Sequence, residues 1–346
     1  MRLSVGFAFS IICSSSLLLS CGAPARGGGT AGAGGSASGS AGASGAAGTT
    51  GTGGSSSGTG GSSIGTGGSS SGTGGSSSGT GGSSTGTGGS APAVPFPTQA
   101  CLDKANALLA QMTQDEKAAQ TIQAERAQIS NAQVMQYAPG SIYSQGGSAP
   151  STNTPAGWAA MINGYRAASR QSAHAIPVIY GLDSVHGLGP VANATIFPHN
   201  IGLGATGDAA LVEQVGRAIA DESAGVGADF PFAPVIAVAR DERWGRTYES
   251  FAETPDLVST MGNALIKGLQ FPTGGTKISI LADAKHYVGD GGTAMGVTGA
   301  NTSGDEATLR AIHLAPYQAA VAARAGSVML SYSSWQGTKM HINKMM

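Results

Sequence analysis

Four apolar, strand-like segments of this chain are each followed directly by a cluster of polar residues. The first two are IPVIYG before LDSVHG, at 176–187, and DFPFAPVIAVA before RDERWGRTYES, at 229–250. The other two are ISILADA before KHYVGDGGT, at 278–293, and SVMLS before YSSW, at 327–335. Polar residues just past the carboxyl ends of successive parallel strands form the active-site face of a (β/α) barrel. The pattern therefore predicts one pocket assembled from several loops.

Segments with helical spacing alternate with the strand-like segments, which is typical of βαβ units around a parallel sheet. Thr113 and Glu116 have the spacing of a capping box at the start of one helix. We expect helices at 102–112, 115–126, 158–172, 209–223, 254–269 and 306–325. We expect strands at 141–145, 176–181, around 232–238, 278–284 and 327–331. The predicted fold is α/β: a (β/α)8 TIM-like barrel that is incomplete in this chain, because about five of the eight βα units are found.

The N-terminal residues have the pattern of a secretory signal, with Arg2 followed by an apolar stretch at 3–19. That stretch ends in Leu18-Leu19-Ser20-Cys21, which resembles the lipobox of bacterial lipoproteins. Residues 1–20 are therefore predicted to be a lipoprotein signal peptide and Cys21 to be lipidated. We expect an exported cell-envelope lipoprotein, on a bacterial outer membrane or extracellular, held to the membrane by its lipid. The alternative is an ordinary signal with an incidental cysteine.

Residues 21–97 are predicted to be a disordered linker. No charged side chain occurs from 27 to 102, and from Gly51 the heptad GTGGSSS recurs with single-residue changes. Such a composition has too few apolar groups to offset the entropy cost of ordering. Over the whole chain 18 Lys and Arg balance 19 Asp and Glu, which gives a net charge of −1. That balance gives no electrostatic reason to expect nucleic acid as a partner.

Five motifs in the same order resemble glycoside hydrolase family 3, in its β-glucosidase and exo-β-glucanase branch: GLDSVHG, ATIFPHNIGLGAT, RDERWGRTYES, KHYVGDGGT and SYSSWQGTKMH. The resemblance runs from about Cys101 to the last residue, so residues 98–346 are expected to be part of that family's N-terminal barrel domain. It implies hydrolysis of terminal β-D-glucosyl residues from β-glucosides or β-glucan oligosaccharides, by a retaining mechanism and without a cofactor.

The resemblance also implies which residues hold the substrate. Asp183 matches a carboxylate that accepts hydrogen bonds from sugar hydroxyls, and Arg246 with the adjacent Lys285 and His286 matches donors to the same sugar. Tyr332 matches a tyrosine that positions the catalytic nucleophile. The structural alternatives are a turn or N-cap role for Asp183, a surface ion pair for Arg246, a buried core position for His286 and packing at the barrel end for Tyr332.

Several other charged or aromatic residues of these motifs are expected to have structural roles in packing, in ion pairs or in shaping loops: Arg240, Arg243, Trp244, Trp335, His186, Glu249 and Asp290. Asp183, His186 and His286 are metal-ligand types, but nothing here has the spacing of a zinc motif such as HExxH. No metal site is therefore expected.

The catalytic carboxylates are expected outside this chain. In the family the nucleophile is an Asp in a VSDW-type motif at the end of the next strand, beyond Met346. The loop at 289–293 lacks the acid/base His of the related β-N-acetylhexosaminidases, so the acid/base Glu is expected on a second domain. The chain alone is expected to be inactive. Two alternatives remain: a non-catalytic, surface-anchored carbohydrate-binding protein derived from the same family, and a decayed product that does not fold stably.

Overall fold

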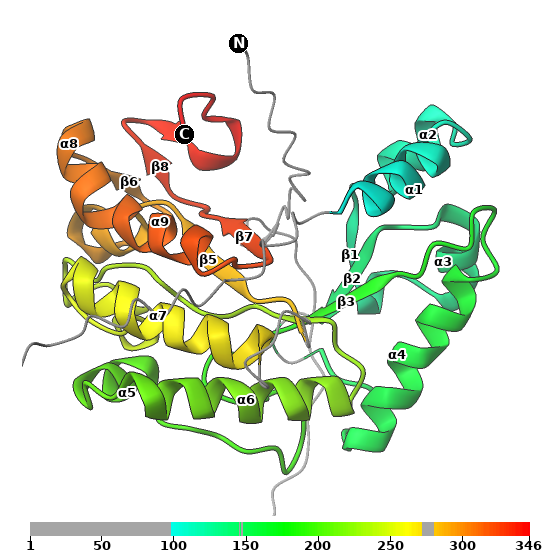
Figure 1. Cartoon of the computed structure of the whole chain (residues 1–346), viewed down its shortest axis with the longest axis horizontal. Coiled ribbons are helices and arrows are strands. Elements are labelled where there is room, and N and C mark those ends of the chain that lie inside the picture. Colours follow the sequence, from blue (N-terminus) through cyan, green and yellow to red (C-terminus); the bar gives the residue numbers. More distant parts are fainter. Residues whose placement is uncertain (1–97, 145, 147, 272–279) are drawn as a thin grey trace, which may run out of the picture. The chain divides into compact units, whose positions relative to one another are not determined.

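The computed structural model describes residues 98–144, 146, 148–271 and 280–346 (Figure 1). The predictions for the signal peptide, Cys21 and the linker lie outside these residues. The described part is an α/β fold with parallel strands. Four of them form one parallel sheet in the order β1-β2-β3-β4. Their bounds are Gln123–Glu125 for β1, Ser141–Ser144 for β2, Ile179–Leu182 for β3 and Phe230–Pro231 for β4.

The chain beyond β4 joins this sheet to a second parallel pair, β5 (Asp283–Tyr287) and β7 (Ser327–Leu330). Val235 forms a parallel bridge with Lys285. The Ile236 amide donates to the Lys285 carbonyl at 2.9 Å, and the Lys285 amide donates to the Pro234 carbonyl at 3.0 Å. Strands β1, β2, β3, β4, β5 and β7 therefore run in the same direction, and their carboxyl ends share one edge of the sheet.

A small separate sheet has the order β6-β8-β9, with bounds Asn301–Thr302, Ser334–Trp335 and Thr338–Lys339. The α-helices are α1 Gln99–Leu109, α2 Gln114–Ala119, α3 Asn131–Tyr137, α4 Pro155–Ser169, α5 Asn200–Ala205, α6 Ala209–Gly225, α7 Pro255–Gln270, α8 Glu306–Thr308 and α9 Ala315–Ala322. Short 3-10 turns are η1 Arg126–Gln128, η2 Thr247–Glu249, η3 Asp290–Gly292, η4 Ala294–Gly296 and η6 Met340–Ile342, and η5 (Leu309–Leu314) is π-helical. None of the described helices has the length and apolar character needed to span a membrane.

Helices α6 and α7 pack closely against each other, and two glycines permit this (Figure 1). A Cβ atom at Gly268 would lie 2.2 Å from the Glu213 carbonyl oxygen, and one at Gly216 would lie 2.8 Å from the Leu265 carbonyl oxygen. Any larger residue there would push the helices apart. The larger apolar core lies between these helices and β5, and a second core packs α4 against β2 and β3.

The structure corrects the predicted helix at 115–126. Its start is right, because Thr113 and Glu116 form the expected capping box. The helix α2 ends at Ala119, however, and β1 follows with Ala124 in register with Ile142 of β2. Pairing with a neighbouring strand outweighs the local helical preference of such a short segment. The parallel strands therefore begin one strand earlier than the sequence predicted.

Two further predictions, one strand and one helix, are corrected. The strand predicted at 278–284 is β5 at Asp283–Tyr287, with residues 278–279 outside the described part. Lys285 and His286 thus lie within the strand rather than after it, because the pairing with β7 extends to Tyr287. The helix predicted at 306–325 is divided into α8, the π-helical η5 and α9. Pro316 lies at the start of α9, where it cannot donate a helical hydrogen bond.

Candidate active site

Asp183 and Lys285 meet at the carboxyl edge of the sheet. Asp183 directly follows β3, and its Oδ1 atom lies 3.3 Å from the Lys285 Nζ atom. The Lys285 side chain is only 4% exposed, whereas that of Asp183 is 41% exposed. The buried ammonium therefore sits behind a carboxylate that faces solvent, and a ligand can reach that carboxylate directly.

Arg246 and Glu249 form a second ion pair at the same edge, in the loop that contains η2. The Arg246 Nε and Nη2 atoms donate to the two Glu249 carboxylate oxygens at 2.8 and 2.7 Å. Burial favours the neutral form of each group, but the pair more than offsets this: the pKa of Glu249 is lowered and that of Arg246 is raised. The buried Asn200 of α5 donates to the Glu249 carbonyl at 2.8 Å. Both groups are thus held charged and in a fixed position.

His286 and Asp290 form a third pair. The His286 Nδ1 atom lies 2.7 Å from the Asp290 Oδ2 atom, and both side chains are buried. Burial lowers the pKa of His286, and Asp290 opposes the shift. Gly291 allows the Asp290 loop to approach the chain beyond β4, because a Cβ there would lie 2.3 Å from the Val238 carbonyl oxygen. A glycine is therefore required at this position of the GDGG sequence, because any side chain would clash with that carbonyl group.

The three pairs act on one another electrostatically. Burial lowers the pKa of Arg246, Glu249 raises it by more, and the charges of Asp290 and Asp183 add smaller increases. Lys285 and His286 contribute in the same way to the lowered pKa of Glu249, after burial and Arg246. We name the set Asp183, Arg246, Glu249, Lys285, His286 and Asp290 the carboxyl-edge cluster. Four of the five predicted substrate-binding residues belong to it.

Tyr332, the fifth, lies apart from the ion pairs. It follows β7, and its side chain is 63% exposed. The Lys339 Nζ atom lies 4.2 Å from the centroid of the Tyr332 ring and donates to the Tyr332 carbonyl at 2.8 Å. The ring also stacks on His341 at a centroid distance of 6.4 Å. Among the described residues, no hydrogen bond or ion pair joins Tyr332 to the carboxyl-edge cluster.

The residues expected to have structural roles divide into two groups. Arg243 pairs with Asp241 at 2.6 Å near the surface, and Trp244 is 2% exposed in the core, as expected. Glu249 and Asp290 were expected to shape loops, but they are the direct partners of Arg246 and His286. Their spacing of three and four residues from those partners was the signal that sequence reasoning did not use.

Asp283 was not recognised from the sequence. Its side chain is completely buried on β5, and Oδ1 accepts a hydrogen bond from the Ser327 hydroxyl at 2.7 Å. Oδ2 is buried and has no partner in the described part of the chain. Burial raises the pKa of Asp283 to about 6, and the Ser327 hydrogen bond and the Lys285 charge limit the rise. The available signal was its position two residues before Lys285, because alternate residues of a strand share a face.

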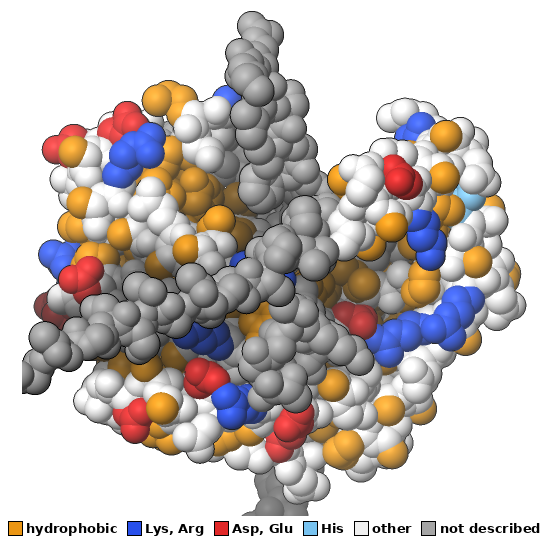
Figure 2. Space-filling view, in the orientation of Figure 1, with side chains coloured by type: hydrophobic (Ala, Val, Ile, Leu, Met, Phe, Trp, Pro, Cys, Tyr) orange, Lys and Arg blue, Asp and Glu red, His pale blue; other side chains and the backbone are white. Residues whose placement is uncertain are grey.

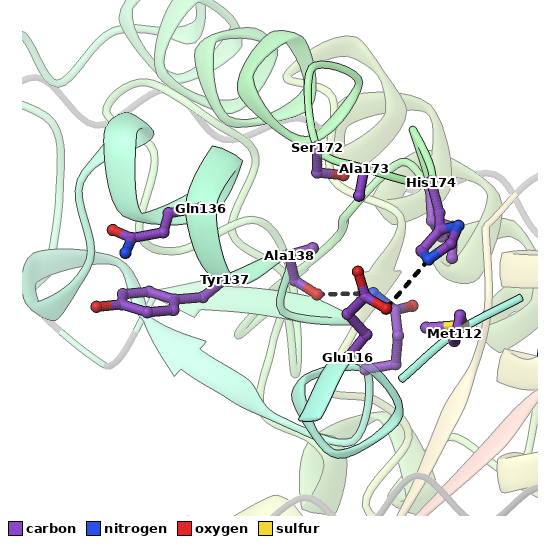
Figure 3. Close-up of a pocket in the computed structure, with 10 residues that line it drawn as sticks. Met112, Glu116, Gln136, Tyr137, Ala138, Ser172, Ala173 and His174 are labelled. Atoms are coloured by element: carbon purple, nitrogen blue, oxygen red, sulfur yellow. Dashed lines mark hydrogen bonds and ion pairs between the residues drawn. The ribbon is translucent and has the colours of Figure 1, made fainter. Parts of the chain in front are cut away.

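A small pocket lies at the opposite edge of the sheet, before the amino ends of β1, β2 and β3 (Figure 3). Its polar groups satisfy one another: His174 Nε2 lies 3.2 Å from Glu116 Oε2, and Gln120 Nε2 donates to the Ala138 carbonyl at 2.7 Å. Because these contacts belong to helix α2 and to the turns that lead into the strands, they have a structural explanation. The carboxyl-edge cluster is the better candidate for chemistry.

The charge pattern limits what this site can bind. No group of three or more His, Cys, Asp or Glu side chains in the described part is arranged to hold a metal ion. Figure 2 shows Lys and Arg interspersed with Asp and Glu over the drawn face, with apolar and uncharged side chains between them. Paired charges that combine donors with one accessible carboxylate suit a neutral ligand with many hydroxyl groups.

Comparisons with known proteins agree with this chemistry. The family model described as the N-terminal domain of glycosyl hydrolase family 3 matches residues 112–346. A lysosomal beta glucosidase of Dictyostelium discoideum is 35% identical over 179 residues, which are 49% of this chain and 21% of that protein. The chain thus spans about a fifth of the length of the curated relatives it matches.

Solved structures give the same result. An exo-1,3/1,4-beta-glucanase from a Pseudoalteromonas species matches with a TM-score of 0.67 and 42% identity, over 70% of this chain and 31% of that one. A beta-glucosidase from Listeria innocua, solved in complex with glucose, matches with a TM-score of 0.61 and 26% identity, over 70% of this chain and 34% of that one. A mutant of the Listeria enzyme was solved with laminaribiose.

Proposed function

The chain belongs to glycosyl hydrolase family 3 by its match to that family's N-terminal domain, and on this premise we propose that it supplies the sugar-binding part of a β-glucosidase or exo-β-glucanase. The observation that carries the proposal is the carboxyl-edge cluster. Its buried ion pairs hold one partly exposed carboxylate, Asp183, at the edge of a parallel sheet. We propose that this sheet is part of a (β/α) barrel, in which such an edge is the active-site face.

The cluster would hold the terminal glucosyl residue of a β-glucoside or β-glucan. Asp183 accepts hydrogen bonds from sugar hydroxyls, while Arg246, Lys285 and His286 donate to other hydroxyls of the same ring. These side chains already have partners within the cluster, and Lys285 and His286 are buried, so little reorganisation is needed on binding. A ligand that lacks one of the hydroxyls would leave a buried polar group without a partner, which gives the site its selectivity.

The hydrolysis itself would use a retaining mechanism, in which two carboxyl groups about 5–5.5 Å apart serve as nucleophile and acid/base. The carboxylates of the cluster have partners of their own: Asp183 and Glu249 lie in ion pairs, and Asp290 is hydrogen-bonded to His286. We propose, as the resemblance to the family implies, that the nucleophile Asp and the acid/base Glu lie beyond Met346. Tyr332, exposed beside the carboxyl ends of the strands, would position the nucleophile.

Lipidation of Cys21 would place this activity on the outer surface of a cell envelope, with residues 21–97 as a tether. The proposal rests on the Leu-Leu-Ser-Cys sequence after an apolar run. Expression of the chain and of Cys21→Ala in a bacterium, followed by fractionation, tests it. We expect the parent in the membrane fraction and the variant in the soluble fraction; equal partitioning of both contradicts the anchor.

A chimera tests the catalytic proposal. Residues 98–346 replace the matched segment of the Pseudoalteromonas exo-glucanase, and an aryl β-glucoside is the substrate. We expect turnover with retention of anomeric configuration, and a loss of orders of magnitude in kcat/KM when Asp183→Ala is introduced, because the change leaves Lys285 without its carboxylate partner. The 346-residue chain alone should show no turnover. Turnover by that chain, abolished by Asp183→Ala in a variant that still folds, would place a catalytic carboxylate within it.

A further inference from the structure

We propose that Asp283 is a positioning residue of the sugar site: its buried carboxylate draws the Lys285 ammonium inward and so leaves Asp183 free to accept hydrogen bonds from a sugar. The proposal rests on the proposed function, because it assumes that Asp183 is the sugar acceptor. It adds a residue to the site and predicts how the affinity for sugar changes with pH.

Lys285 is in contact with one carboxyl group, that of Asp183, and its charge acts on a second, that of Asp283. Asp283 and Lys285 are two residues apart on β5, so their side chains project to the same face of the strand. Asp183 approaches Lys285 from the edge of the sheet, with its Oδ1 atom 3.3 Å from Nζ. Lys285 has three N–H donors, and Asp183 is its one hydrogen-bond partner among the described residues.

Asp283 is poised to accept from Lys285. Its Oδ1 atom already accepts from the Ser327 hydroxyl, while Oδ2 is buried and has no partner among the residues that the structure describes. A buried carboxylate oxygen without a donor is costly, and Lys285 supplies the positive charge that acts on this carboxyl. An inward movement of the flexible lysine side chain would satisfy Oδ2 and lengthen the contact with Asp183.

The charge of Asp283 changes in an accessible pH range. The groups that act on it are Lys285 on its own strand, Asp183 from the loop after β3 and Tyr317 from α9, with the neutral Ser327 on β7. Burial raises the pKa of Asp283 to about 6. Below that pH the carboxyl is neutral and Lys285 pairs with Asp183 alone. Above it the two carboxylates share Lys285, and Asp183 becomes a better acceptor for sugar hydroxyls.

Titration calorimetry of glucose into the 346-residue chain tests this at pH 5 and pH 7.5. We expect the wild-type affinity to rise by about three- to tenfold with pH, the contribution of one hydrogen bond to a charged group. Asp283→Asn should keep the weaker, pH 5 affinity at both pH values. Ser327→Ala removes a hydrogen bond that lowers the Asp283 pKa, so the midpoint of its affinity profile should move to higher pH. An identical profile for wild type and Asp283→Asn overturns the proposal.

The Asn variant is expected to fold at pH 7.5, because the ionised Asp283 costs stability there and the amide does not. In the folded chain this carboxyl holds its proton to about pH 6, above its ordinary value, so its ionisation opposes folding as the pH rises.

A second measurement separates the two proposals. If the chain binds no glucose at any pH, the proposed function fails for this chain. The carboxyl ¹³C chemical shift of Asp183, followed against pH, then still tests the coupling between Asp183 and Asp283. A change in this shift near pH 6 that disappears in Asp283→Asn supports the coupling. No such change in the wild type overturns it.

Discussion

The two edges of the parallel sheet hold charged groups under opposite conditions. At the carboxyl edge, Lys285, His286, Glu249 and Asp290 are all buried, and each has an oppositely charged or imidazole partner. At the amino edge, the pair of Glu116 and His174 lines a small pocket, and Glu116 also caps helix α2. The charged groups at the carboxyl edge are thus buried away from water, whereas Glu116 at the amino edge lies at the start of a helix.

The difference favours the carboxyl edge as the candidate active site. Burying a charge is expensive even when it is paired, and an apolar replacement is often as stable. Helix capping, by contrast, explains Glu116 fully through local hydrogen bonds to Thr113. A hollow in the surface is therefore a weaker sign of function here than a set of desolvated, mutually oriented charges. The carboxyl edge has such a set, while the pocket at the amino edge is accounted for by the turns around it.

The largest expected effect comes from breaking the buried pair at the carboxyl edge. Glu249→Ala leaves the Arg246 guanidinium without its bidentate partner and should lower the free energy of unfolding by about 2–4 kcal/mol. The matched change at the amino edge, Glu116→Ala, removes an exposed cap and should cost clearly less. Urea denaturation of both variants at pH 7 measures this. Equal losses would mean that the two edges do not differ as described.

A second prediction concerns His313, which is buried in η5 against Gly292 of the Asp290 loop. Burial lowers its pKa to about 4. Between pH 6.5 and 4 the unfolded chain therefore binds a proton that the folded chain does not, so this residue's contribution to stability is lost as the pH falls. Between pH 6.5 and 4 the free energy of unfolding should therefore fall by about 2–3 kcal/mol less in His313→Gln than in the wild type. Denaturation at pH 4.5, 5.5 and 7 gives the slope; a slope identical to that of wild type would contradict a neutral, buried His313.

A smaller effect is expected at the exposed aromatic ring of the carboxyl edge. Tyr332→Ala should weaken glucose binding by about three- to tenfold, the amount typical of one aromatic contact. The variant should keep its stability, because the ring is 63% exposed. Calorimetry with glucose measures the affinity, and Tyr332→Phe serves as a control that keeps the ring. If the alanine variant binds as wild type does, Tyr332 contributes nothing to holding this sugar.

The smallest effect is expected at the amino edge. His174→Ala removes the contact with Glu116 and should change glucose affinity by less than about twofold, because distant sites with no shared partners act independently. The same calorimetric titration applies. A tenfold loss in a folded variant would show that the pocket at this edge takes part in sugar binding, and the contrast between the edges would no longer hold.

The convergence of Asp183, Arg246, Lys285 and His286 was predictable, because each follows or ends a strand and the carboxyl ends of parallel strands share an edge. The existence of the shortest strand and the role of a buried polar residue within a strand were harder to predict. Strand β1 is only three residues long and depends on pairing with β2, which no local pattern encodes. Asp283 lies in a run predicted as an apolar strand, and its importance depends on Lys285 and Ser327, the latter distant in sequence. A local sequence motif does not show which residues distant in sequence become partners on folding.

The central claim is that the carboxyl edge holds a glucosyl residue through Asp183. Titration of glucose into the 346-residue chain at pH 7.5 tests it most directly, beside Asp183→Asn and a control variant, Asp115→Asn, at an exposed aspartate in the first turn of α2. The account predicts binding that Asp183→Asn weakens by about ten- to a hundredfold, as expected when a charged hydrogen-bond acceptor is lost, and that Asp115→Asn leaves unchanged. Undiminished affinity in a folded Asp183→Asn variant would contradict the account.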